Sequence, residues 1–131
     1  MTMFHAVVLI DHHQAQVLQF DAEHVQAEKV KARTHHTKQH GSAVRTEHEF
    51  YAVVCDALAG IAEVLVTGSH TALTDFRHYV EKHRPALVPQ VVGYELVDHP
   101  SDRQLVALAK QYFLKYDQMN GGRTAAPESS R

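Results

Sequence analysis

One stretch of this chain, residues 62–98, limits the possible folds more than any other. In order, it contains an apolar run, a turn, a helical pattern, a proline and a second apolar run: 63–67, Gly68-Ser69, 70–83, Pro85 and 91–97. A strand, a tight turn, a helix and a second strand form a βαβ unit, which joins two parallel neighbouring strands. Such crossovers are right-handed, so the helix is expected on one defined face of the sheet.

The remaining segments supply further strands and helices around this unit. Apolar or alternating segments predict strands over 5–10, 15–20 and 24–31, with short turns between them. Thr46 followed by Glu49 is typical of a capping box and predicts that a helix begins at Thr46. Ser101, with Gln104 three residues later, predicts the start of a last helix in the same way. The predicted order is therefore β-β-β-α-β-α-β-α.

This order is that of an α/β protein with the ribonuclease-H-like architecture, a mixed five-stranded sheet with helices on both faces. A chain of 131 residues is long enough for one good hydrophobic core. We expect a single domain over residues 1–119. Asn120-Gly121-Gly122 is expected to end the last helix, and residues 120–131 are expected to form a disordered tail.

Composition restricts the location of the protein. No apolar run approaches the length of about 18 residues that a membrane-spanning helix needs, and no basic region precedes an apolar segment at the amino terminus. The single cysteine, Cys55, cannot form an internal disulfide, which fits a reducing compartment. These features predict a cytoplasmic protein that does not associate with membranes.

A basic segment, residues 29–46, stands out against an acidic body. It contains five cations and no Asp or Glu; because the whole chain carries a net charge of −2, the other residues together carry −7. Such a segment suits phosphate backbones, although on charge alone a solvated surface loop is the simpler explanation. The candidate nucleic-acid-binding residues are Lys29, Lys31, Arg33, His35, His36, Lys38, His40 and Arg45.

A second candidate site is the turn Gly68-Ser69, which joins a predicted strand to a predicted helix. Backbone amides and the helix dipole at such a turn can hold an anion. No phosphate-binding glycine pattern is present, so an ordinary helix cap by Ser69 is the simpler interpretation.

Catalysis and metal binding have weaker support. A ribonuclease-H-type metal nuclease would need a cluster of carboxylates, for which the sequence offers Asp11, Glu47, Asp98 and Asp102. Each of these acids also fits a structural role in a turn or at a helix start. The pairs His12-His13 and His36/His40 do not have the spacing of a dedicated zinc site. We therefore predict no enzyme, cofactor or metal; a module that forms homodimers through a sheet edge is a further alternative.

Several segments resemble, in order, the middle domain of archaeal and eukaryotic peptide-chain release factors and of Pelota. They are Phe4–Phe20, the basic loop leading into Glu49-Phe50-Tyr51, Leu65-Val66-Thr67-Gly68 and Val91–Asp98. The segment Asp98–Phe113 further resembles a group of small, single-domain bacterial proteins called translational machinery proteins; that likeness covers about residues 4–119.

In release factors, the loop before the first helix carries a Gly-Gly-Gln tripeptide that promotes peptidyl-tRNA hydrolysis. The matching loop here reads Gln39-His40-Gly41-Ser42, so the hydrolytic role is not carried over. Pelota also lacks the tripeptide and acts in ribosome rescue. The resemblance therefore implies a partner that is a ribosome or a structured RNA, and association without hydrolysis.

Overall fold

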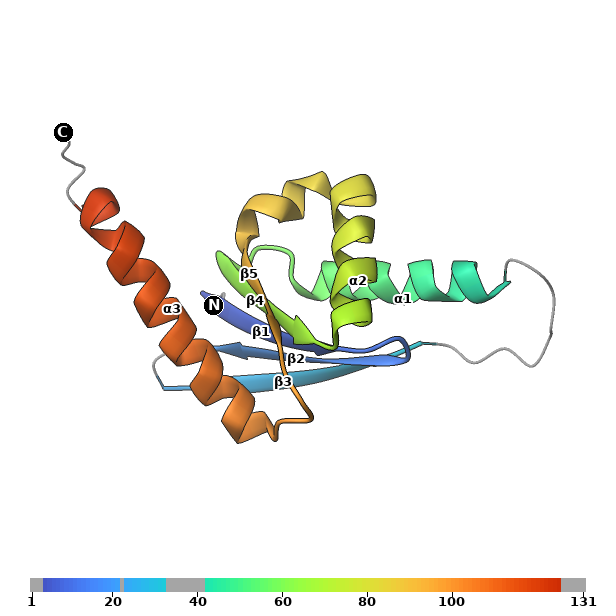
Figure 1. The fold of residues 1–131 in the computed structure, drawn as a ribbon, viewed down its shortest axis with the longest axis horizontal. Helices are drawn as coiled ribbons and strands as arrows, with labels where there is room; N and C mark the ends of the chain where they lie inside the picture. Colours follow the sequence, from blue (N-terminus) through green and yellow to red (C-terminus); the bar gives the residue numbers. More distant parts are fainter. Residues whose placement is uncertain (1–3, 22, 33–41, 126–131) are drawn as a thin grey trace. The chain divides into compact units, whose positions relative to one another are not determined.

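The computed structural model describes residues 4–21, 23–32 and 42–125. For residues 42–45 and 120–125 it describes the backbone alone. The chain divides into two compact units, residues 1–99 and 100–131, which are described separately. Figure 1 shows the elements of each unit. The sequence analysis did not predict a division at this point.

The first unit begins with a three-stranded antiparallel meander. The strands are β1 (His5–Ile10), β2 (Gln14–Phe20) and β3 (Val25–Lys31), and each is within one residue of its prediction. Register pairs His5 with Phe20 and Gln14 with Lys31. β3 lies at the sheet edge and exposes every residue except Val30, as the polar sequence of that strand predicted.

The βαβ unit follows after helix α1 (Ser42–Ala57). It consists of β4 (Glu63–Gly68), α2 (His70–His83), a short 3₁₀ helix η1 (Pro85–Gln90) and β5 (Val91–Leu96). β4 pairs in parallel with both β1 and β5, which gives the strand order β3-β2-β1-β4-β5. The predicted mixed five-stranded sheet and ribonuclease-H-like fold are therefore confirmed.

A hydrophobic core joins one face of this sheet to α1 and α2. Alternate β1 residues Ala6, Val8 and Ile10 enter the core, as alternation in a strand requires. From α1 the core takes residues that recur on one helical face, and from α2 it takes Ala72, Leu73, Phe76 and Val80. Thr67 is a buried polar residue whose hydroxyl donates to the Val8 carbonyl at 2.7 Å, which ties β4 to β1.

Helix α1 begins earlier than predicted. The capping box at Thr46 and Glu49 predicted the start at Thr46, whereas the helix already includes Ser42. That prediction was wrong because nothing in Ala43-Val44-Arg45 opposes helix, and a capping motif marks a start only when the preceding residues leave the helical conformation. Arg45 therefore belongs to the helix rather than to the basic loop.

The second unit contains helix α3 (Asp102–Ala125). Its start is a capping box, as predicted: the Ser101 amide donates to Gln104 Oε1 at 2.9 Å, and the Gln104 amide donates to Ser101 Oγ at 3.1 Å. Leu105, Ala109 and Phe113 are buried and recur along one face of the helix.

The predicted end of α3 at Asn120-Gly121-Gly122 was wrong, because the helix continues to Ala125. Two glycines cost about 2 kcal/mol in a helix interior relative to alanine, and the long run of good helix formers before them, such as Leu114 and Lys115, outweighs that penalty. The last part of the tail predicted for residues 120–131, residues 126–131, lies outside the described residues.

Candidate functional site

The carboxyl ends of the parallel strands meet at one end of the sheet. β1 ends at Ile10 beside Gly68, the last residue of β4, and Gly68 in turn pairs with Leu96 at the end of β5. β3 also ends here, since the Ala32 amide donates to the His13 carbonyl at 2.7 Å. The basic segment therefore leaves the sheet at this end, which is where open α/β sheets most often bind ligands.

The turn between β1 and β2 is organised by Asp11. Its amide donates to the Gln14 carbonyl at 2.9 Å, and its carboxylate accepts from the amides of His13 at 2.6 Å and Gln14 at 2.7 Å. This is the structural turn role that the sequence predicted for Asp11. The turn fixes the position of His12 at its tip.

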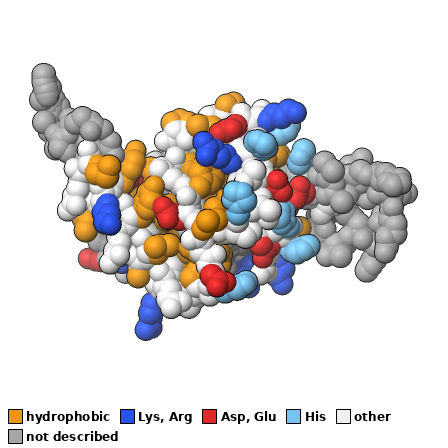
Figure 2. Space-filling view, in the orientation of Figure 1, with side chains coloured by type: hydrophobic (Ala, Val, Ile, Leu, Met, Phe, Trp, Pro, Cys, Tyr) orange, Lys and Arg blue, Asp and Glu red, His pale blue; other side chains and the backbone are white. Residues whose placement is uncertain are grey.

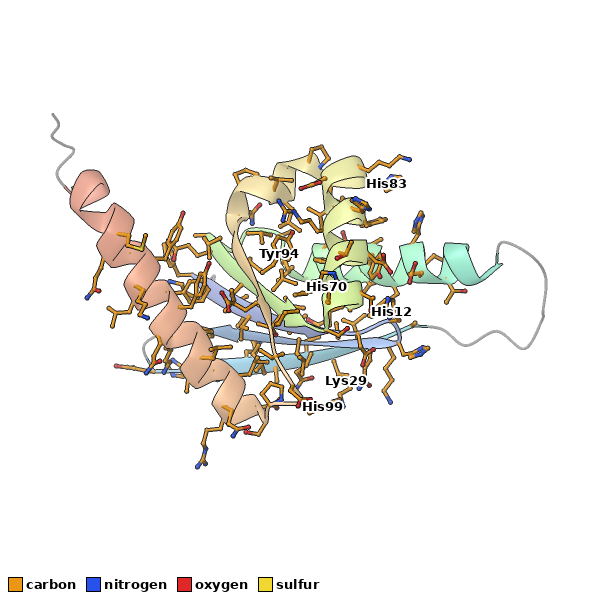
Figure 3. The ribbon with its side chains drawn as sticks, in the orientation of Figure 1. His12, Lys29, His70, His83, Tyr94 and His99 are labelled. Atoms are coloured by element: carbon orange, nitrogen blue, oxygen red, sulfur yellow. The ribbon has the colours of Figure 1, made fainter. Side chains whose placement is uncertain are left out.

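His12 meets acidic side chains from two helices. His12 Nε2 lies 3.0 Å from Asp75 Oδ2 of α2, and the ligand atoms of His12, Asp75 and Glu47 of α1 all lie within 4.8 Å of one another. Figure 3 labels His12 at this end of the sheet. We call these three residues the His12 cluster. Sequence analysis noticed Glu47 and the pair His12-His13, but no local pattern connects them with Asp75, which lies 63 residues from His12.

A groove of about 640 Å³ runs between α1 and α2 beside this cluster. Its lining is rich in histidine and in acidic side chains, which Figure 2 shows interspersed over this part of the surface. The ring of Tyr79 lies 5.2 Å from that of His48 and 4.8 Å from that of His83. The lining residues are Glu47, His48, Tyr51, Asp75, His78, Tyr79, Glu81, Lys82 and His83.

Tyr51 lies at the floor of the groove. Its side chain is 1 % exposed, and its ring packs 5.4 Å from the rings of Phe76 and Tyr79. Its hydroxyl has no partner in hydrogen-bond geometry among the described residues. Burial, and then the negative charges of Glu47 and Asp75, raise the pKa of Tyr51. Glu47 is near enough to influence the phenol but is not placed for a full hydrogen bond.

Two of the eight candidate nucleic-acid-binding side chains are described. Lys29 and Lys31 are exposed on β3 and share one face of the strand, opposite the buried Val30. For Arg45 only the helical backbone is described. The remaining candidates lie outside the described residues: Arg33, His35, His36, Lys38 and His40.

The turn Gly68-Ser69 has the features of an ordinary helix cap. Ser69 is the N-cap of α2, and its Oγ accepts from the Ala72 amide at 3.3 Å. Gly68 is buried, and its carbonyl accepts from the Val97 amide at 3.1 Å. A Cβ at Gly68 would overlap the Ile10 carbonyl oxygen, so close packing of β4 on β1 accounts for the glycine. Anion binding at this turn stays a prediction.

Each of the acids considered for a nuclease is described in the structure. Among the described residues, the close groups of potential metal ligands include Glu47 but none of Asp11, Asp98 and Asp102. Asp11 holds its turn, the Asp98 side chain is 98 % exposed, and Asp102 begins α3.

Within the described residues, no helix has the length and apolar character needed to cross a membrane.

Solved structures with a similar fold include two Pelota proteins and a translation termination factor. The Pelota protein of Archaeoglobus fulgidus matches 94 % of this chain with a TM-score of 0.61 and 17 % identity, and Thermoplasma acidophilum Pelota matches 83 % with 0.58 and 14 %. The archaeal translation termination factor aRF1 matches 91 % with a TM-score of 0.55 and 12 % identity. The matched regions cover 35 %, 32 % and 42 % of those chains, so this chain spans less than half of each.

These likenesses establish a fold like that of one domain of Pelota and of the archaeal termination factor. No protein-family model matches this chain, including any for the bacterial translational machinery proteins, and no curated protein matches it.

Proposed function

We propose that this protein is a non-enzymatic, translation-related protein that binds a ribosome or a structured RNA in the cytoplasm through its basic segment. The observation that carries this proposal is where the segment leaves β3, at the end of the sheet at which the parallel strands β1, β4 and β5 have their carboxyl ends. In a fold similar to that of Pelota and a translation termination factor, the most cationic part of the sequence follows β3 and precedes α1, and β3 ends where open α/β sheets most often bind ligands.

Electrostatics supports phosphate as the group that is bound. Lys29 and Lys31 are exposed on the edge strand β3, where long cationic side chains can reach a polyanion. The chain carries a net negative charge overall, so a polyanion would approach through this region rather than through the rest of the surface. Displaced counterions would then supply most of the affinity.

The absence of a Gly-Gly-Gln tripeptide in Gln39-His40-Gly41-Ser42 supports binding without peptidyl-tRNA hydrolysis. We therefore expect purified protein to bind ribosomes without releasing peptide from them. Release of peptide from loaded ribosomes at a rate above that of buffer alone would refute this part of the proposal.

The main test is co-sedimentation of the full chain with ribosomes over a series of salt concentrations. Binding should weaken steeply with salt, and replacing Lys29, Lys31, Arg33, Lys38 and Arg45 by alanine should abolish it. The double variant Lys29→Ala/Lys31→Ala should reduce the slope of log K against log salt by about 1.5, because each lost phosphate contact removes about 0.7 to 0.9.

A matched control removes the same charge elsewhere. Lys82 and Lys115 are exposed lysines on α2 and α3, and Lys82→Ala/Lys115→Ala should leave the salt slope within about 0.3 of the original value. The proposal fails if the wild-type protein does not sediment with ribosomes at low salt, or if the control pair weakens binding as much as the Lys29/Lys31 pair does.

A further inference from the structure

The His12 cluster combines three side chains whose chemistry is that of metal ligands. One imidazole nitrogen and two carboxylate oxygens come from three separate elements: the β1–β2 turn, α1 and α2. In a tetrahedral zinc site, neighbouring ligand atoms lie roughly 3.3 Å apart. The His12–Asp75 distance of 3.0 Å is already close to that value, and all three ligand atoms lie within 4.8 Å of one another.

The surroundings favour a cation over an anion. The groove beside the cluster is lined by three carboxylates, Glu47, Asp75 and Glu81, and by one lysine, Lys82. Glu81 also pairs with Arg77 at 3.0 Å, whereas Glu47 and Asp75 face the imidazole of His12. Two carboxylates gathered around one imidazole leave an excess of negative charge, even when that imidazole is protonated. A divalent cation would neutralise this excess.

Tyr51 provides a second, independent indication. Its hydroxyl is buried, lacks a hydrogen-bond partner among the described residues, and lines the same groove as Glu47 and Asp75. Buried hydroxyl groups in folded proteins are normally satisfied, so an orphaned one calls for an explanation. If Glu47 turns to bind a cation, its second oxygen can accept from this hydroxyl and be held in place, as outer partners hold metal ligands elsewhere.

We propose that His12, Glu47 and Asp75 form a binding site for a divalent transition-metal cation, with Tyr51 positioning the Glu47 carboxylate. One nitrogen and two oxygen ligands suit Zn²⁺ or Mn²⁺ better than Mg²⁺ or Ca²⁺, which prefer oxygen alone. Three protein ligands leave a coordination position open toward the groove. This site does not depend on ribosome or RNA binding.

The experiment is calorimetric titration of the chelator-treated full chain with Zn²⁺. The chain has twelve histidines, so weak background binding is expected, and neighbouring residues provide the matched pair. His12→Ala and His13→Ala each remove one imidazole from the same turn, and no ion pair or metal-ligand group includes the His13 side chain among the described residues. The wild type should bind one equivalent of Zn²⁺ more tightly than any further equivalents. Of the two variants, only His12→Ala should weaken the binding of this first equivalent, by at least about tenfold.

A second pair of variants distinguishes the loss of a metal ligand from misfolding. Asp75→Asn keeps the shape of the side chain and should also weaken the first equivalent at least about tenfold, whereas Asp98→Asn should leave it within about twofold. At one equivalent, Zn²⁺ should raise the thermal midpoint of the wild type and of His13→Ala more than that of Asp75→Asn. The proposal is overturned if no equivalent binds more tightly than the others, or if the His12 and His13 variants behave alike.

Discussion

The two ends of the sheet in residues 1–99 use the same turn chemistry in different surroundings. At one end, the Asp11 carboxylate accepts from the amides of His13 and Gln14; at the other, the Asp21 carboxylate accepts from those of Glu23 and His24, both at 2.8 Å. A glycine lies near each end of β4, Gly60 before it and Gly68 at its last position. The local sequence therefore encodes two nearly equivalent hairpin turns.

The difference arises from the helices. The histidine in the first turn, His12, reaches Asp75 of α2 and lies near Glu47 of α1. Among the described residues, the ion pair of His24 in the second turn is with Asp21 of its own turn, at 3.4 Å. Two nearly equivalent turns thus acquire different chemistry because α1 and α2 bring acidic side chains to His12, and the described residues show no such contact at His24. Four substitutions, taken from the largest expected effect to the smallest, test this contrast.

The largest effect is expected from Gly68→Ala. The new methyl group would overlap the Ile10 carbonyl oxygen, and the neighbour is backbone, so β1 and β4 would have to separate where the Asp11 turn begins. We expect the free energy of unfolding to fall by about 3 kcal/mol in urea titrations. Gly60→Ala is the control: its Cβ would meet no atom within 4 Å, and its φ of 84° predicts a loss of only about 1 kcal/mol. Equal losses would show that packing at Gly68 is unimportant.

Asp11→Ala should have the next largest effect. It removes the acceptor for two backbone amides, and the free energy of unfolding should fall by about 1–2 kcal/mol. Asp11→Asn keeps an acceptor oxygen and should lose less than half as much. Chemical shifts of His12 and Asp75 in NMR spectra should move in Asp11→Ala, because the turn positions His12. Unchanged shifts would indicate that α2 alone places His12.

Tyr51→Phe should leave the free energy of unfolding unchanged, or raise it by up to about 1 kcal/mol, when metal is absent, although it alters a fully buried side chain. The hydroxyl has no hydrogen-bond partner among the described residues, so its removal ends a desolvation cost without breaking a bond. Urea titrations in the presence of chelator measure this effect. A loss of more than 1 kcal/mol would mean that the hydroxyl is satisfied in the metal-free protein.

The smallest effect concerns Asp21 and appears only in acid. Hydrogen bonds from the amides of Glu23 and His24 lower the pKa of Asp21 below its ordinary value of 3.8. A lowered folded-state pKa stabilises the protein above about pH 4, and this contribution is lost as the pH falls through the folded-state value. The difference in urea midpoint between wild type and Asp21→Asn should therefore shrink between about pH 6 and pH 2. A difference in urea midpoint that stays constant over this pH range would contradict the prediction.

Much of the fold followed from local patterns. The βαβ unit was visible because 63–67 and 91–97 are apolar and flank a helix with its own N-cap at Ser69, and the reciprocal bonds of Ser101 and Gln104 followed from three-residue spacing. Helix ends were less predictable. Thr46 looks like a cap but lies inside α1, and two glycines near 121 do not end α3, because such signals are weak against favourable neighbours.

The candidate site followed from sequence only in part. Asp11 was assigned its turn from residue type alone, whereas the contact of His12 with Asp75 depends on how α2 packs on the sheet. Tyr51 was not singled out, because a tyrosine at a helical position is usually part of a core and only the unsatisfied hydroxyl distinguishes it. Sequence patterns reveal side chains that act on their own backbone, but they rarely reveal partners across the fold.

The parallel pairing of β1 with β4 has a consequence for how the chain is made. His5 pairs with Glu63, and the two residues are 58 positions apart. At a synthesis rate of about 5–20 residues per second, β4 is synthesised roughly 3–12 seconds after β1, and until then one edge of β1 is unpaired. During this interval Val7 and Val8, which are buried in the folded protein, are exposed in the nascent chain. Slower translation of codons 11–63 would lengthen this interval and increase the risk of aggregation.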